Sequence, residues 1–178
     1  MESRAKLLGH PIHPMLVVIP LGMFIGAVVF DGLYLWTGYS TLASAAYWNI
    51  VGGIAGGLLA AVFGLIDWLA IPSGTRAKRI GLLHGGSMVL VVGAFGLAWL
   101  MRSTAGDISG DISPTAGIFL LEVAALLVGG VSGWLGGELV DRLAVGVDDG
   151  AHLNAPSSLS GLPASQTVGG PSQHRRVS

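Results

Sequence analysis

The chain has 178 residues, of which 52% are hydrophobic and 11% are charged, and its formal net charge is −1. Soluble domains contain about 25% charged residues, so this composition excludes an ordinary soluble domain and indicates a membrane protein. A net charge near zero gives no indication of the basic surface that nucleic-acid binding needs. The absence of cysteine excludes disulfides, thiolate metal sites, cysteine-held iron–sulfur clusters and covalently attached c-type haem.

Four segments are long and apolar enough to cross a bilayer, which takes about 20 residues in a helix. We expect them at residues 15–36, 47–71, 80–101 and 115–140. The connections between them are short, so consecutive helices should be antiparallel neighbours. The sequence therefore predicts an all-α polytopic membrane protein in which residues 15–141 form an antiparallel four-helix transmembrane bundle.

The basic residues predict how the bundle is oriented. With four spans, the N-terminal segment 1–14, the second connection and the C-terminal segment lie on one side of the membrane. That side holds eight of the nine Lys and Arg residues, and the other side holds only Arg102. By the positive-inside rule, both termini should be cytoplasmic. The C-terminal segment 142–178 becomes rich in Gly, Pro and Ser, and we expect it to be a mostly disordered cytoplasmic tail.

Ionisable side chains inside a membrane are costly and are therefore candidates for function. Five of them are expected at the cytoplasmic level of the bundle, and all four helices contribute: His10, His13, Asp67, His84 and Glu138. The opposite level holds Asp31 and Glu122, which are expected to be structural polar groups near the outer interface. No basic side chain is expected to be embedded in the membrane at that level.

Two kinds of cofactor suit the five residues. A b-type haem takes two neutral imidazoles from facing segments at similar depth. His13 and His84 are then the candidate axial ligands, and His10, Asp67 and Glu138 would surround them or lie near the propionates. The alternative is a non-haem zinc or iron site built from the same five side chains. A proton relay is a third use of histidines that lie beside carboxylates.

The same residues also have purely structural interpretations. His13 could begin a helix at the wet interface, Asp67 could pair with an arginine of the next connection, and Glu138 could be solvated. His84 is harder to explain in this way because its helix is otherwise uncharged. On this interpretation the chain is a non-enzymatic structural or interaction protein of the membrane.

No common enzyme motif is present in the chain. It has no Gly-x-Ser-x-Gly elbow, Walker loop, His-Glu-x-x-His motif or dinucleotide fingerprint, which favours a protein that is not an enzyme. A transporter of this size would have to form a homo-oligomer. The lipid bilayer is the partner that the composition itself predicts.

Glycine is the second anomaly of the composition, at 29 residues. The second helix carries a stripe of it at positions 52, 53, 56 and 57, and the fourth helix carries another at positions 129, 130, 133, 136 and 137. Small residues at this spacing let helices approach closely. The alternative interpretation is that these glycines make room for a flat cofactor against the helix backbone.

Several segments resemble a known bacterial family. They are the doubled His-Pro motif Gly-His-Pro-Ile-His-Pro at 9–14, the stretches 64–68, 74–76 and 83–85, and Gly-Trp-Leu-Gly-Gly-Glu-Leu-Val at 133–140. Together they resemble the membrane family called domain of unknown function 2231, over about residues 7–160. The resemblance implies a four-helix protein of the bacterial cytoplasmic (inner) membrane.

Some members of that family resemble fusions with Rieske-type iron–sulfur domains, so the resemblance implies a Rieske-type redox protein as a partner. This implication adds support to the haem interpretation and leaves the structural alternative open. Some members also have a histidine shortly before the position of Pro20, where this chain has Val18 and Ile19. Any role of that histidine is not available to this chain.

Overall fold

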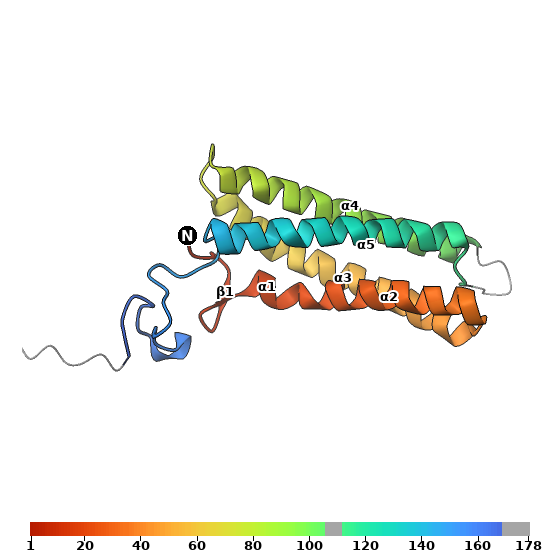
Figure 1. The fold of residues 1–178 in the computed structure, drawn as a ribbon, viewed down its shortest axis with the longest axis horizontal. Helices are drawn as coiled ribbons and strands as arrows, with labels where there is room; N and C mark the ends of the chain where they lie inside the picture. The colour runs from red at the N-terminus through yellow and green to blue at the C-terminus, as the bar shows by residue number, and fades with distance from the viewer. Residues whose placement is uncertain (106–111, 169–178) are drawn as a thin grey trace, which may run out of the picture.

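Four long helices lie side by side in the computed structural model, which describes residues 1–105 and 112–168 (Figure 1). They are α2 (Val18–Thr37), α3 (Ser40–Ala70), α4 (Arg76–Ala105) and α5 (Ala116–Gly137). Each belongs to a helical segment that is long and apolar enough to cross a membrane. The predicted all-α, four-helix transmembrane architecture is therefore confirmed.

Short elements precede α2. A two-stranded antiparallel hairpin, β1 (Lys6–Leu7) and β2 (His10–Pro11), leads into the short helix α1 (Ile12–Leu16). Only Val17 separates α1 from α2. The interruption has a local cause, because Pro20 has no N–H to donate to the carbonyl one turn earlier.

The helices extend beyond the apolar runs from which they were predicted. α3 begins at Ser40 instead of residue 47, and α4 exceeds the expected range 80–101 at both ends. Hydropathy falls where polar residues begin, but a helix can continue through them: the Ser44 hydroxyl donates to the carbonyl of Ser40 one turn earlier. The connection between α2 and α3 is therefore short, and Gly38 takes the positive φ of 77° that ends α2.

The bundle consists of two helical hairpins. α2 packs mainly against α3, and α4 packs mainly against α5. Between the hairpins the rings of Phe24 and Phe95 stack, with centroids 4.0 Å apart. The buried core around these rings contains Ala27, Ile50, Val91 and Ala125.

The glycines of α3 form a close seam with α2. A Cβ added at Gly52, Gly53 or Gly56 would lie 2.5–2.8 Å from side chains of α2, so these positions permit an approach that larger residues would block. On α5, a Cβ added at Gly130 or Gly133 would meet no described atom within 4 Å. The packing interpretation therefore holds for the first glycine stripe but not for the middle of the second.

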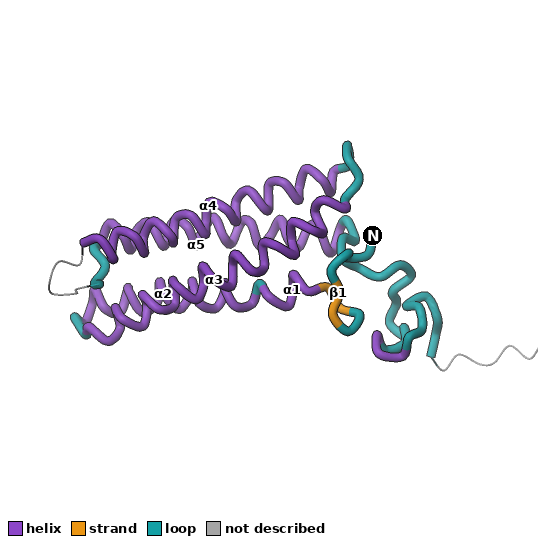
Figure 2. The backbone as a smooth tube through the Cα atoms, turned by 180° about the vertical axis from the view of Figure 1, so that it is seen from behind, coloured by secondary structure: helices purple, strands orange, loops and turns teal. Residues whose placement is uncertain are grey.

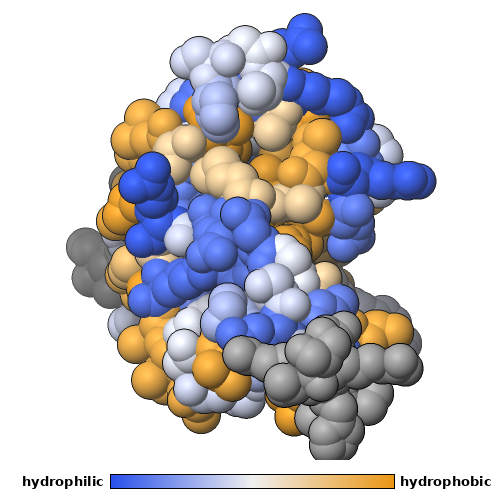
Figure 3. All heavy atoms as spheres, turned by 90° about the vertical axis from the view of Figure 1, so that its left-hand side faces the viewer, coloured by the Kyte–Doolittle hydropathy of each residue, from blue (hydrophilic) through white to orange (hydrophobic). Residues whose placement is uncertain are grey.

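Large apolar side chains cover the outside of the bundle. Leu21, Leu58, Leu90 and Leu127, one from each long helix, are all more than half exposed. Such an exterior is stable in lipid, where apolar surface is not in contact with water. Hydrophilic residues gather instead on one end of the bundle, with hydrophobic residues around and between them (Figure 3).

The beginning of the chain and its C-terminal segment meet at that same end, which we call the terminal end (Figures 1 and 2). α5 continues there as a π-helical turn (Glu138–Arg142), and a 3-10 turn (Ser158–Ser160) follows. The amino group of Met1 donates to the carbonyl of Ala144 at 3.0 Å. The expected disorder of the tail stays a prediction, and residues 169–178 lie outside the described residues.

Candidate functional site

The imidazole rings of His13 and His84 lie across from each other near the terminal end. Their centroids are 6.5 Å apart and their planes meet at 86°. His13 is on α1, at the start of the first hairpin, and His84 lies about two turns into α4, at the start of the second. Both helices begin at the terminal end, so the two side chains lie at the same level along the bundle. The sequence predicted this common level from their depths.

Each ring is anchored through Nδ1 to a backbone carbonyl of the second long helix of its own hairpin, α3 for His13 and α5 for His84. His13 Nδ1 donates to the Ala60 carbonyl at 2.9 Å, and His84 Nδ1 donates to the Ser132 carbonyl at 2.8 Å. A carbonyl only accepts, so Nδ1 carries the proton in each neutral ring and Nε2 carries the lone pair. Among the described residues, neither Nε2 atom has a hydrogen-bond partner.

Glycine makes both anchors possible. Gly64 follows the acceptor residue of α3 by one turn, and Gly136 follows that of α5 by one turn, so each shares a helix face with its acceptor. A Cβ at Gly64 would lie 2.9 Å from the His13 ring, and one at Gly136 would lie 3.2 Å from the His84 ring. Each imidazole therefore rests on a bare patch of helix backbone.

The second hairpin repeats the arrangement of the first. Three pairs of residues that are 71 positions apart contact each other: His13 with His84, Phe24 with Phe95, and Asp31 with Arg102. Two of these pairs join residues of the same type, and the histidines make the same contact with α3 and with α5, which indicates an approximate twofold axis along the bundle between the hairpins. Membrane proteins built from parallel repeats have this kind of symmetry. The anchored histidine is thus one feature that occurs twice.

Comparison with known proteins identifies the family. Residues 9–149 match a family model described as "Predicted membrane protein (DUF2231)". The chain belongs to this family. No curated protein and no solved structure matches the chain. The match covers both helical hairpins, and the description as a membrane protein agrees with the four candidate membrane spans of the structure.

Two of the predicted site residues have other partners in this DUF2231 chain. Asp67 accepts hydrogen bonds from the Ser3 hydroxyl and from the Arg4 N–H, each at 2.8 Å, and so ties the N-terminal segment to α3. Glu138 accepts from the guanidinium of Arg76 at 2.5 Å. Asp67 was expected to pair with an arginine of the next connection, but Arg76, one of the arginines expected there, pairs with Glu138 instead.

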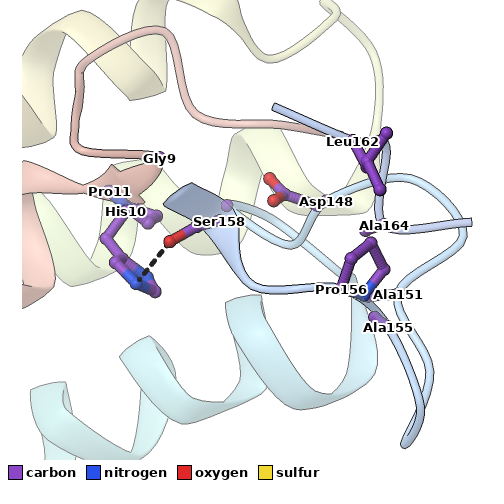
Figure 4. A pocket seen from close by; sticks show the side chains of 11 residues that line it. Gly9, His10, Pro11, Asp148, Ala151, Ala155, Pro156, Ser158, Leu162 and Ala164 are labelled. Carbon is purple, nitrogen blue, oxygen red and sulfur yellow. Dashed lines mark hydrogen bonds between the residues drawn. The ribbon is translucent and has the colours of Figure 1, made fainter. Parts of the chain in front are cut away.

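His10 contacts the C-terminal segment instead of the other histidines. Its Nε2 is hydrogen-bonded to the Ser158 hydroxyl at 3.2 Å, beside a hollow of about 300 Å³ (Figure 4). The preceding turn explains the direction of the side chain. Leu8 and Gly9 both have positive φ, 52° and 83°, as in the tight turns of two-residue hairpins, and this turn brings β2 against the C-terminal segment.

The structure therefore brings together two of the five predicted residues, His13 and His84. Within residues 1–105 and 112–168, no group of three or more His, Cys, Asp or Glu side chains is close enough to hold a metal ion. The five-residue zinc or iron site is not assembled, because Asp67, Glu138 and His10 each make a contact at the surface of the terminal end.

The opposite end of the bundle, which we call the far end, differs from its prediction. Arg102 was expected in the connection after the third span, but α4 continues to Ala105 and the guanidinium is buried against Asp31 and Glu122. The expectation of no embedded basic side chain at this level was wrong, and the two carboxylates lie inside the bundle. Opposite charges at matching depth in three spans were the signal that could have revealed this cluster.

Proposed function

We propose that this DUF2231 protein holds a b-type haem between His13 and His84 and serves electron transfer in the membrane. The observation that carries the proposal is the pair of imidazoles with Nδ1 anchored and Nε2 unpartnered among the described residues. Histidines that bind metals almost always donate from their other nitrogen to a carbonyl or carboxylate, which fixes the tautomer and the ring direction.

The spacing of the rings would allow His13 and His84 to hold one metal atom together. A metal–imidazole bond is about 2.0–2.1 Å long, so two rings that hold the same atom through nitrogen would have centres at most roughly 6–6.5 Å apart. The observed separation of the centroids is 6.5 Å. An approximate twofold axis that passes between the rings gives both histidines the same relation to a central atom.

The surroundings of the rings are apolar helices, and Gly64 and Gly136 leave each ring directly against helix backbone. The chain has no cysteine, so attachment would be non-covalent. A bound haem would supply one-electron chemistry, while the two histidines and the apolar helices around them would set its potential.

We also propose that the protein lies in the bacterial cytoplasmic membrane with both termini in the cytoplasm, and that its redox partner is a Rieske-type iron–sulfur protein. The partner rests on the family resemblance. The orientation rests on the basic residues: with Arg102 buried in the bundle, the far-end connections at 38–39 and 106–115 contain no Lys or Arg.

A structural role is the second candidate function. The contacts of Asp67 with Ser3 and of Glu138 with Arg76 favour it for those two carboxylates, because each joins one segment to another at the terminal end. On this alternative the histidine pair is a packing feature and the purified protein carries no cofactor.

Optical spectroscopy of the full-length protein separates the two candidates. The haem proposal predicts a Soret band that shifts on reduction and a visible α band, with stoichiometric haem. His13→Ala and His84→Ala should each remove both bands, and His10→Ala is the matched control that should keep them, because His10 contacts Ser158 instead. A colourless protein from cells supplied with haem, or colour retained in His84→Ala, would overturn the proposal.

A further inference from the structure

Three charged side chains from three helices meet inside the far end of the bundle. Arg102 on α4 forms a two-bond fork with Asp31 on α2: Nη1 donates to Oδ1 at 3.1 Å, and Nη2 donates to Oδ2. Nη2 also donates to Oε1 of Glu122 on α5, at 2.5 Å. All three side chains are fully buried.

The formal charges of this cluster do not cancel. Arginine keeps its proton in proteins, so Arg102 contributes one positive charge and two ionised carboxylates would contribute two negative charges. A net charge buried in a membrane-spanning bundle is strongly unfavourable. One proton on the carboxylate pair makes the cluster neutral.

The twofold relation of the hairpins identifies the surplus carboxylate. Asp31 and Arg102 occupy equivalent positions in the two hairpins, and their forked pair is already neutral. Glu122 has no such counterpart: equivalent positions of α3 and α5 are 72 apart, as for Ala60 and Ser132, and the residues 72 and 71 positions before Glu122 are Ile50 and Val51. Glu122 therefore adds a negative charge to a pair that is complete without it.

The contacts of Glu122 agree with a bound proton. Its Oε2 atom is buried and has no hydrogen-bond partner among the described residues. Oε1 of Glu122 and Oδ2 of Asp31 accept from the same Nη2 atom of Arg102, so the two carboxyl groups are close neighbours. Two carboxylates that share a site repel each other strongly, and one proton on the pair removes this repulsion.

The remaining helix, α3, adds no formal charge at this level within the described residues. Its titratable side chain there is Tyr47, whose ring lies 6.4 Å from that of Trp99, about one turn before Arg102. The charge count therefore depends on Asp31, Arg102 and Glu122. The cluster is also separate from the histidine pair: 18 residues of α4 between His84 and Arg102 correspond to about 27 Å.

We propose that Asp31 and Glu122, held by Arg102, form a proton-binding site within the membrane span that holds one proton at neutral pH. The ligand is the proton itself, and the three side chains that hold it are fully buried. This site does not depend on whether the histidine pair binds a haem.

Infrared spectroscopy of the full-length protein in lipid nanodiscs tests the proposal. We expect the carbonyl stretch of a protonated carboxylic acid at pH 7, with a small shift in D2O and a larger shift when Asp and Glu are labelled with ¹³C. The isotope experiment uses the wild-type chain, so it does not require any variant to fold. Absence of the band at pH 7 would overturn the proposal.

Matched variants assign the band. Glu122→Gln and Asp31→Asn should each abolish it, because either one leaves a single carboxylate that pairs with Arg102 in its ionised form. Glu138→Gln is the control and should leave the band unchanged, since Glu138 pairs with Arg76 at the other end of the bundle. A band that persists in folded Glu122→Gln and Asp31→Asn proteins would place the proton elsewhere and refute the site.

Discussion

The imidazole of His13 rests directly on Gly64. A Cβ at Gly64 would lie only 2.9 Å from both Cε1 and Nδ1 of the ring, which is closer than side-chain atoms can pack. The missing side chain is what lets His13 reach the Ala60 carbonyl one turn earlier on the same helix face. This contact joins the first histidine of the pair to the helix that fixes its direction.

Gly64→Ala should therefore push the His13 ring off its anchor. Overpacking of this kind costs about 1–3 kcal/mol, and we expect the free energy of unfolding in detergent or nanodiscs to fall by that amount, with weaker haem binding. Gly85→Ala is the matched control, because a Cβ there meets no described atom within 4 Å. Equal stability of the two variants would contradict the packing described for His13.

Asp67→Ala should release the N-terminal segment without affecting the histidine pair. The substitution removes the acceptor of the exposed Arg4 N–H and leaves the buried Ser3 hydroxyl only the Ala5 carbonyl at 3.1 Å, so we expect a loss of about 1 kcal/mol of stability. Amide hydrogen exchange at Arg4 should become faster. Asp141→Ala, an exposed carboxylate at the same end, serves as the control. Unchanged exchange at Arg4 would show that Asp67 is not the anchor.

Lys6 should make the docking of the C-terminal segment depend on pH. Its ammonium donates to Asp148 at 2.5 Å and to Glu2 at 2.7 Å. These hydrogen bonds, that of Asp148 first, raise the pKa of Lys6 above its ordinary value. The Lys6 hydrogen bond, followed by that from the Asp149 N–H, lowers the pKa of Glu2.

The directions of the two pKa shifts define the pH range in which the docked C-terminal segment is most stable. The contribution of Lys6 is fully present below its ordinary pKa and is lost as the pH rises through the raised value, while that of Glu2 is present above its ordinary pKa and is lost as the pH falls through the lowered value. Distances between spectroscopic labels on the β1–β2 hairpin and on the C-terminal segment should be shortest within this pH range. Lys6→Met should remove the alkaline limb of the curve and weaken the acidic limb, where the Asp149 N–H still lowers the pKa of Glu2, and a wild-type profile in that variant would contradict the assignment.

The topology has a direct test. A reporter fused after Ser178 should read as cytoplasmic, because the basic residues lie at the terminal end and Arg102 is removed from the count of loop charges by its burial. Activity of a reporter that works only outside the cytoplasm would reverse the proposed orientation.

The sequence predicted the architecture because apolar runs of this length have few alternatives in a membrane. The level of His13 and His84 followed from topology and depth alone. The positions of His10 and Asp67 did not, because the Leu8–Gly9 turn and the contacts of Ser3 are local details that depth does not determine.

The far-end cluster was missed for a different reason. Arg102 lies beyond the apolar run of its helix, so hydropathy assigned it to a connection, whereas two buried carboxylates make its position inside the bundle favourable. The repeat was also missed, because few positions keep the same residue: Gly22 and Gly93 match, as do Ala27 and Ala98, but most neighbours differ.

The spin state of ferric iron in the purified protein tests the central claim most directly. Two imidazole ligands on one haem should give a six-coordinate, low-spin signal in electron paramagnetic resonance, and His13→Ala should convert it to high spin or abolish it. A high-spin signal in the wild-type protein, or no haem iron in protein from cells supplied with haem, would contradict ligation by His13 and His84.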